Sequence, residues 1–170
     1  MKRRSLLKLG IGAAVVLGVA GAGVALMRPA LINGKFSTDV HALMRAVAEG
    51  VLDGLLPVDA SARSARLSVQ LAQLETTIAG LPAATRSELS QLLALLATGA
   101  GRFGLVGLTS DWASASAAEV REGLSAMGAS SIGLRQQVYH ALRDLNTLVF
   151  FNDPSSWALV GYPGPREIAV

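Results

Sequence analysis

Aliphatic side chains recur every three or four residues along most of this chain, a spacing that places them on one face of an α-helix. The first such stripe runs from Val40 to Leu55, behind the capping residues Ser37-Thr38-Asp39 and ahead of Pro57. A second stripe runs from Leu67 to Ile78, and a third from Leu89 to Leu96. These patterns predict three helices in the first half of the folded part.

The ends of these helices also have recognisable signals. The second helix can start around Asp59 or Ser61 and stop at Gly80, and Pro82 suits the first turn of the third. Glycines then interrupt residues 99–107, where we expect a short helical turn and a loop.

Two more helices are predicted in the second half. Ser116-x-x-Glu119 is a capping box that opens a helix through about Met127, where Gly128 ends it. Ser130-Ser131 is expected to cap a longer helix that buries aliphatic residues between 134 and 150 and stops before Pro154.

Strand patterns are scarce, and we expect no hairpin. The predicted fold class is therefore all-α, a single small bundle of about five helices after an N-terminal signal or transmembrane helix. We assign residues 1–27 to that segment, 28–36 to a linker, 37–153 to the helical domain and 154–170 to an irregular tail rich in Pro, Gly and aromatic residues.

The N-terminal segment begins with the sequence Lys2-Arg3-Arg4-Ser5-Leu6-Leu7-Lys8. It resembles the twin-arginine export motif, in which an arginine pair is followed by a free position, an apolar pair and often a lysine. The residues of this expected export signal are Arg3, Arg4, Leu6, Leu7 and Lys8. The alternative is a basic flank on a general secretory signal or a membrane anchor.

Leu9 to Met27 is an uncharged run of 19 residues, rich in Gly and Ala. As a helix it would span about 28 Å, close to the hydrocarbon thickness of a bilayer. Ala20-Gly21-Ala22 offers small residues for signal cleavage. We expect the domain on the periplasmic side, either soluble after cleavage or anchored to the inner membrane with the N-terminus in the cytoplasm.

The positive charge of the chain is concentrated in that segment. Four of its 15 basic residues precede the apolar run, which leaves 11 basic residues against 12 acidic ones in the remainder. A nearly neutral domain lacks the basic surface that nucleic acids require, so we expect no nucleic-acid partner.

Residues able to carry catalysis are few. The chain has no cysteine and only two histidines, His41 and His140. His140 and Asp144 lie one helical turn apart, where a surface hydrogen bond is a simpler expectation than a metal site or a hydrolase centre. Gly101, Gly104 and Gly107 lack the strand and the Lys-Ser/Thr of a phosphate loop. We therefore expect a protein that is itself non-catalytic and has no cofactor or metal.

Aromatic residues gather near the C-terminus, on a segment that also holds several prolines and glycines. Such rings either pack on their own domain or bind a partner, and both possibilities stay open here. The candidate partner-binding residues are Phe150, Phe151, Trp157, Tyr162 and Pro163.

This region resembles a known family of small subunits. The matching residues are Leu142-Arg143-Asp144-Leu145, Phe150-Phe151-Asn152-Asp153-Pro154, Trp157 and Gly161-Tyr162-Pro163-Gly164-Pro165. They are similar to the family typified by gluconate 2-dehydrogenase subunit 3, whose members are helical and bear a twin-arginine signal. The resemblance implies a large flavin-dependent dehydrogenase of the glucose–methanol–choline type as partner, frequently with a multihaem cytochrome c subunit. It also implies a role in maturation and export of that flavoprotein through the twin-arginine translocase.

We therefore expect an accessory subunit, exported with the flavoprotein and bound to it. The alternative is a free-standing periplasmic or membrane-anchored helical domain that binds an apolar small molecule or acts as a scaffold.

Overall fold

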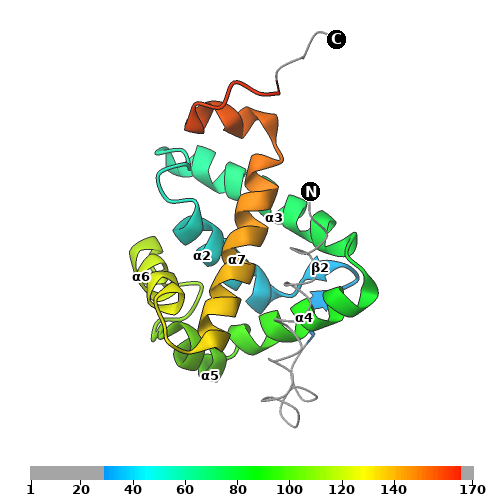
Figure 1. Cartoon of the computed structure of the whole chain (residues 1–170), viewed down its shortest axis with the longest axis vertical. Helices are drawn as coiled ribbons and strands as arrows, with labels where there is room; N and C mark the ends of the chain where they lie inside the picture. Colours follow the sequence, from blue (N-terminus) through cyan, green and yellow to red (C-terminus); the bar gives the residue numbers. More distant parts are fainter. Residues whose placement is uncertain (1–28, 166–170) are drawn as a thin grey trace.

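The computed structural model describes residues 29–165, which form a bundle of helices with one small hairpin (Figure 1). The hairpin strands are β1 (Leu31–Ile32) and β2 (Lys35–Phe36). The elements that follow are α2 (Thr38–Val51), α3 (Ala60–Ala79), α4 (Ala83–Ala97), α5 (Gly99–Gly101), the π-helical turn η2 (Arg102–Val106), α6 (Ala117–Gly128), α7 (Gly133–Phe151) and the 3-10 helix η3 (Pro154–Val160). The mostly helical architecture confirms the predicted all-α class.

Helix α2 is the centre of the bundle, since it packs against α3, α4, α6 and α7. Its inner face is fully buried at Leu43, Met44 and Val47, and Leu74 of α3 and Leu142 of α7 join the same core. An alanine at position 50 would place its Cβ 3.1 Å from the side chain of Val120. Gly50 therefore permits the close approach of α2 and α6. The leucine stripes of the sequence thus face one common core.

Several helix boundaries confirm the sequence signals. The carboxylate of Asp59 accepts the N–H of Ala62 (2.8 Å) at the start of α3, and Gly80 ends that helix. At α6 both hydrogen bonds of the predicted capping box are present, between Ser116 and Glu119.

Two boundaries differ from the prediction. The first helix was expected to continue to Leu55, but α2 ends at Val51, and Gly54 then turns the chain with a φ of 81° that favours glycine. Helix α7 begins at Gly133 with Ile132 in the capping position, and the Ser130 hydroxyl only accepts the N–H of Ile132 (3.2 Å).

The segment assigned to a linker holds the hairpin of β1 and β2, so the expectation of no hairpin was wrong. Asn33 and Gly34 form its turn, with φ values of 52° and 77° that suit a two-residue hairpin. Glu75 of α3 fixes the hairpin to the bundle: its carboxylate accepts the N–H of Phe36 and the ammonium of Lys35, both at 2.9 Å. Burial alone would raise the pKa of Glu75, but these two hydrogen bonds and the charge of Lys35 outweigh it and lower the pKa.

The C-terminal segment is also more regular than predicted. Residues 154–160 form η3, in which Pro154 occupies the first turn, where its missing N–H costs nothing. Asp153 caps this helix through the N–H of Ser155 (3.0 Å). The serine hydroxyl and N–H lower the pKa of that carboxyl, as does the charge of Arg66. Residues 162–165 keep the expected irregular path.

The contact between α3 and α7 contains unpaired polar groups. The amide of Gln70 donates to the carbonyl oxygen of Asn146 (3.0 Å), and the amide of Asn146 donates to the carbonyl oxygen of Leu142 (2.8 Å). Both side chains are fully buried, and neither side-chain oxygen has a hydrogen-bond partner among the described residues.

In residues 29–165 no single helix has the length and apolar composition needed to cross a membrane. Helix α4 and the segment Gly99–Val106 together have enough length and apolar composition, but they are bent by 86° at their junction. Helix α4 also contributes Leu92, Leu93 and Leu96 to the buried core.

Candidate functional site

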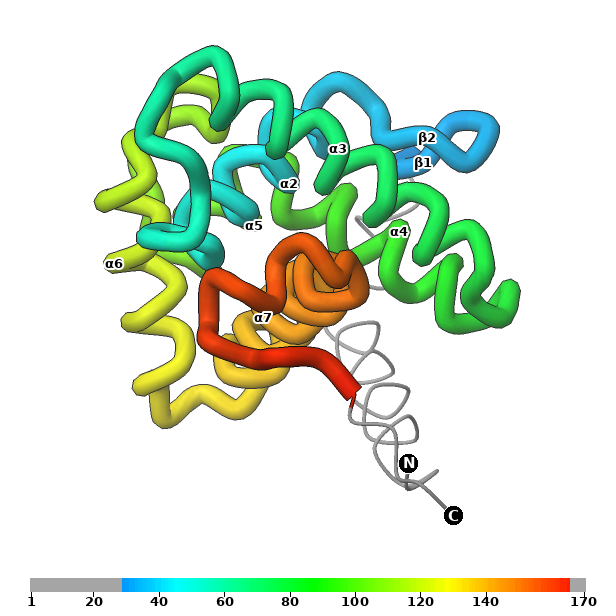
Figure 2. The backbone as a smooth tube through the Cα atoms, turned by 90° about the horizontal axis from the view of Figure 1, so that it is seen from above, coloured from blue at the N-terminus to red at the C-terminus, as the bar shows by residue number. Residues whose placement is uncertain are grey.

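The most distinctive surface lies at one end of the bundle, where η3 and the loop between α2 and α3 are found together (Figures 1 and 2). We call this surface the apolar end. We include in it the following exposed or half-buried apolar residues of these two segments and of the end of α7: Leu55, Leu56, Val58, Phe151, Trp157, Leu159, Val160, Tyr162 and Pro163. The two segments are joined beneath it, because Leu55, Leu56 and Phe151 all pack on the small buried cluster that contains Phe150.

Several apolar side chains of this end are open to solvent. Leu159 is 56% exposed, Val160 53% and Tyr162 48%. Exposed apolar side chains grouped on one surface are typical of a binding site.

The two aromatic rings of the tail are held in defined positions. The indole N–H of Trp157 donates to the carbonyl oxygen of Phe151 (2.7 Å), and the Tyr162 ring meets the Trp157 ring edge-on with centroids 5.3 Å apart. Gly164 lies against the other part of the indole, where a Cβ would come within 3.3 Å of it. The chain's own contacts therefore hold both rings in place.

The adjacent phenylalanines have different roles. Phe150, predicted as a candidate partner-binding residue, is fully buried and packs beneath the guanidinium of Arg66 at 4.6 Å. Phe151 is half-buried and reaches the surface. Of the five predicted residues, the structure brings Phe151, Trp157, Tyr162 and Pro163 to the apolar end and places Phe150 in the core under it.

The sequence analysis missed the α2–α3 loop as part of this surface. Val58 is 94% exposed, and Leu55 and Leu56 are half-buried. Of these residues only Leu55 was interpreted, as part of the last turn of the first helix facing the core. The Asp53-Gly54 pair was the available signal, because it is typical of a turn and would have ended the helix earlier.

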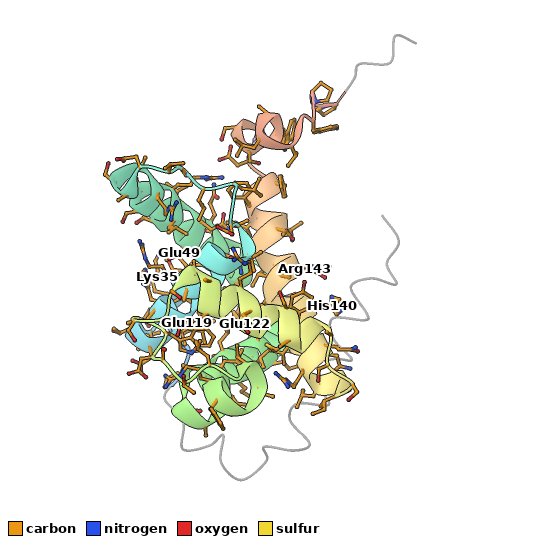
Figure 3. All side chains as sticks on the ribbon, turned by 90° about the vertical axis from the view of Figure 1, so that its left-hand side faces the viewer. Lys35, Glu49, Glu119, Glu122, His140 and Arg143 are labelled. Carbon is orange, nitrogen blue, oxygen red and sulfur yellow. The ribbon has the colours of Figure 1, made fainter. Side chains whose placement is uncertain are left out.

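The charged residues around the apolar end are bound to other groups of the same chain. Arg66 forms an ion pair with Asp153 (3.3 Å), and Arg121 forms one with Asp53. The guanidinium Nε of Arg63 donates to the carbonyl oxygen of Pro57 (2.9 Å). In Figure 3 the labelled charged side chains, among them Glu49, lie over the middle of the bundle, away from η3.

The expected hydrogen bond between His140 and Asp144 is not what the structure shows. Asp144 instead accepts hydrogen bonds from Arg143, at 3.0 Å and 2.8 Å, and this carboxylate raises the pKa of Arg143. The ring of His140, which is labelled in Figure 3, lies beside that of Tyr139, with centroids 5.2 Å apart. No group of three or more His, Cys, Asp or Glu side chains suited to a metal ion occurs within residues 29–165.

The predicted export-signal residues, Arg3, Arg4, Leu6, Leu7 and Lys8, lie outside the described residues. No protein-family model matches the chain, and neither a curated protein nor a solved structure does.

Proposed function

We propose that this chain is a non-catalytic accessory subunit that binds a flavin-dependent dehydrogenase of the glucose–methanol–choline type through its apolar end. In this proposal the twin-arginine segment directs both proteins across the membrane, and the subunit aids maturation and export of the flavoprotein. A cytochrome c subunit is a further member of the complex in the family that the tail resembles.

One observation carries the proposal: the tail residues that resemble the small-subunit family are rigidly held, yet exposed on one surface. Phe151, Trp157 and Tyr162 belong to both sets. Aromatic rings that are fixed in place and partly open to solvent are frequent binding hot spots.

The test is a purification from the native host. The full chain carries a tag after Val170, so that the N-terminal segment stays free, and is isolated from periplasmic and membrane fractions. The expected result is a stoichiometric partner with flavin absorbance. Replacing Arg3-Arg4 by Lys-Lys should remove both proteins from the periplasmic side.

A pair of surface variants connects the partner to the apolar end. Tyr162→Ala should weaken the complex by about 1 kcal/mol or more, which is about a fivefold or larger rise in Kd. Phe103→Ala is the matched control, because Phe103 is 63% exposed on η2 and belongs to a different part of the surface. A colourless chain isolated alone would contradict the proposal and favour the alternative of a free-standing domain that binds an apolar small molecule.

A further inference from the structure

We propose that the hairpin of β1 and β2 is the part of the domain that lies against the membrane, held at the phospholipid headgroups by its short connection to the N-terminal apolar run. This inference rests on that run entering the bilayer, as the proposed export role implies, and not on the partner being a flavoprotein.

The first argument is that the chain enters the described fold at a fixed point. Ala30 is fully buried, and its carbonyl oxygen accepts the N–H of Ser37 (2.8 Å) at the start of α2. The Glu75 carboxylate of α3 accepts the N–H of Phe36 and the ammonium of Lys35. The hairpin is therefore fastened to two helices and cannot move away from the bundle without breaking these bonds.

The second argument is the length of chain between the apolar run and this fixed point. Only Arg28 and Pro29 separate Met27, the last residue of the run, from Ala30. Consecutive Cα atoms lie about 3.8 Å apart, so those of Met27 and Ala30 can be at most about 11 Å apart.

This reach is comparable to the thickness of the headgroup layer. The run of 19 residues from Leu9 to Met27 has, as a helix, about the length needed to fill the hydrocarbon core of a bilayer. The headgroup layer on each side of that core is about 5–8 Å thick. When the run spans the bilayer, Ala30 and the hairpin therefore lie within the headgroups or directly above them.

The two sides of the hairpin differ in a way that suits this position. Leu31 and Phe36 are paired in the register and both pack on the core, with Phe36 only 8% exposed. Ile32 and Lys35 are the other pair, so their side chains share the opposite side of the ribbon. Ile32 is 55% exposed and the Lys35 side chain 68%. An apolar side chain beside a long cationic one is typical of residues at a membrane interface.

The charge of this outward side is already balanced, because the Lys35 ammonium lies 2.9 Å from the Glu75 carboxylate. Attraction to anionic lipid depends on basic side chains that are free to reach the headgroups. We therefore expect the short connection, rather than lipid charge, to hold the hairpin at the bilayer, so that neutral phosphatidylcholine is sufficient.

Helix α2 leads away from the hairpin to the loop that contains Val58. It begins at Thr38, directly after the hairpin, and its 14 residues give it a length of about 20 Å. Figures 1 and 2 show the hairpin apart from the end of the bundle at which η3 lies. Contact of the hairpin with lipid thus leaves the apolar end free for a protein partner.

The experiment uses the absence of native cysteine. A single cysteine is introduced into the full chain as Ile32→Cys, or as Val58→Cys for the matched control, since both side chains are exposed. Each variant is labelled with a fluorophore and reconstituted into phosphatidylcholine vesicles that carry a nitroxide on some lipid headgroups. The expected result is a loss of fluorescence at position 32 and none at position 58. Equal quenching at the two positions, or none at position 32, would overturn the inference.

A spacer tests whether the short connection is the cause. About ten Gly and Ser residues inserted between Met27 and Arg28 have a root-mean-square length of about 18 Å and should abolish the quenching at position 32. Quenching that persists with the spacer, or that requires added phosphatidylglycerol, would show that the connection does not place the hairpin and would overturn the inference.

These outcomes are separable from those of the proposed function, because the vesicles contain no partner. Extraction of the chain from the vesicles by alkali would show that the run is not inserted, which overturns this inference but not the binding of a flavoprotein. A colourless chain isolated alone from the host contradicts the flavoprotein role, whereas quenching at position 32 would still support the membrane contact.

Discussion

Gln70 and Asn146 lie opposite each other where α3 packs against α7, and replacing Gln70 by methionine tests what this buried amide pair contributes. Methionine has nearly the same length and shape as glutamine and is unbranched. The substitution removes the hydrogen bond to the Asn146 carbonyl oxygen, which keeps its own partner within α7. It also removes a buried side-chain oxygen that has no partner.

The expected change in stability follows from these two terms. A neutral hydrogen bond contributes about 1 kcal/mol, whereas a buried carbonyl without a donor costs about 1–3 kcal/mol. The difference predicts that Gln70→Met stabilises the fold by about 1 kcal/mol. For a chain of this size that corresponds to a rise in Tm of about 2–4 °C.

The assay is thermal unfolding of the full chain in a mild non-ionic detergent, followed by circular dichroism at 222 nm. Gln91→Met is the control, because Gln91 is half-buried on α4 and its amide lies 3.4 Å from the Ser87 hydroxyl, so its Tm should not change. Asn146→Leu should behave like Gln70→Met. A loss of about 1 kcal/mol or more in both buried variants would refute the reasoning, because it would mean that a buried water donates to these oxygens.

Three further predictions concern the core, the hairpin and a helix cap. Phe150→Ala should destabilise the chain by about 3–5 kcal/mol in urea unfolding, since the ring is fully buried. The control Phe103→Ala, at an exposed ring, should cost less than about 0.5 kcal/mol. Equal effects of the two substitutions would refute the assignment of Phe150 to the core. The lowered pKa of Glu75 means that its carboxylate stabilises the fold at neutral pH and loses that contribution as pH falls through the acid range. The urea midpoint of Glu75→Gln should therefore be lower than that of the natural chain at pH 7 and approach it toward pH 3. A difference that stays constant with pH would contradict the role of the Glu75 carboxylate in holding the hairpin. Ser116→Ala should cost about 1 kcal/mol, measured in the same way, and no change would show that the capping box is dispensable.

Much of the fold could be predicted because its signals are local. The Asp59 cap and the Ser116–Glu119 box are set by residues within one turn, and the structure confirms both. The hairpin was missed although its turn has a local signal, the pair Asn33-Gly34, which is typical of two-residue hairpins. Each of its strands has two residues, too few for an alternating pattern, and Glu75 fixes them from 39 and 40 positions away.

The apolar end was predictable only in part, for a similar reason. The aromatic content indicated the tail as a candidate surface. Phe150 and Phe151 are adjacent in the sequence, and only the direction in which each side chain leaves the last turn of α7 puts Phe150 in the core and Phe151 at the surface. The loop at Val58 joins this surface through tertiary packing, which a single sequence does not display.

The close contacts of a few glycines offer a way to recognise relatives of this chain. Its helices are rich in Ala, Leu and Ser, residues that many unrelated helices share. A side chain at Gly101 would overlap the carbonyl oxygen of Leu95, one at Gly123 would come within 2.8 Å of Val106, and Gly107 has a φ of 81°. A distant sequence that keeps glycine at these three positions, with an aromatic and proline-rich segment after its last long helix, would be a stronger candidate for the same fold than one that merely matches in composition.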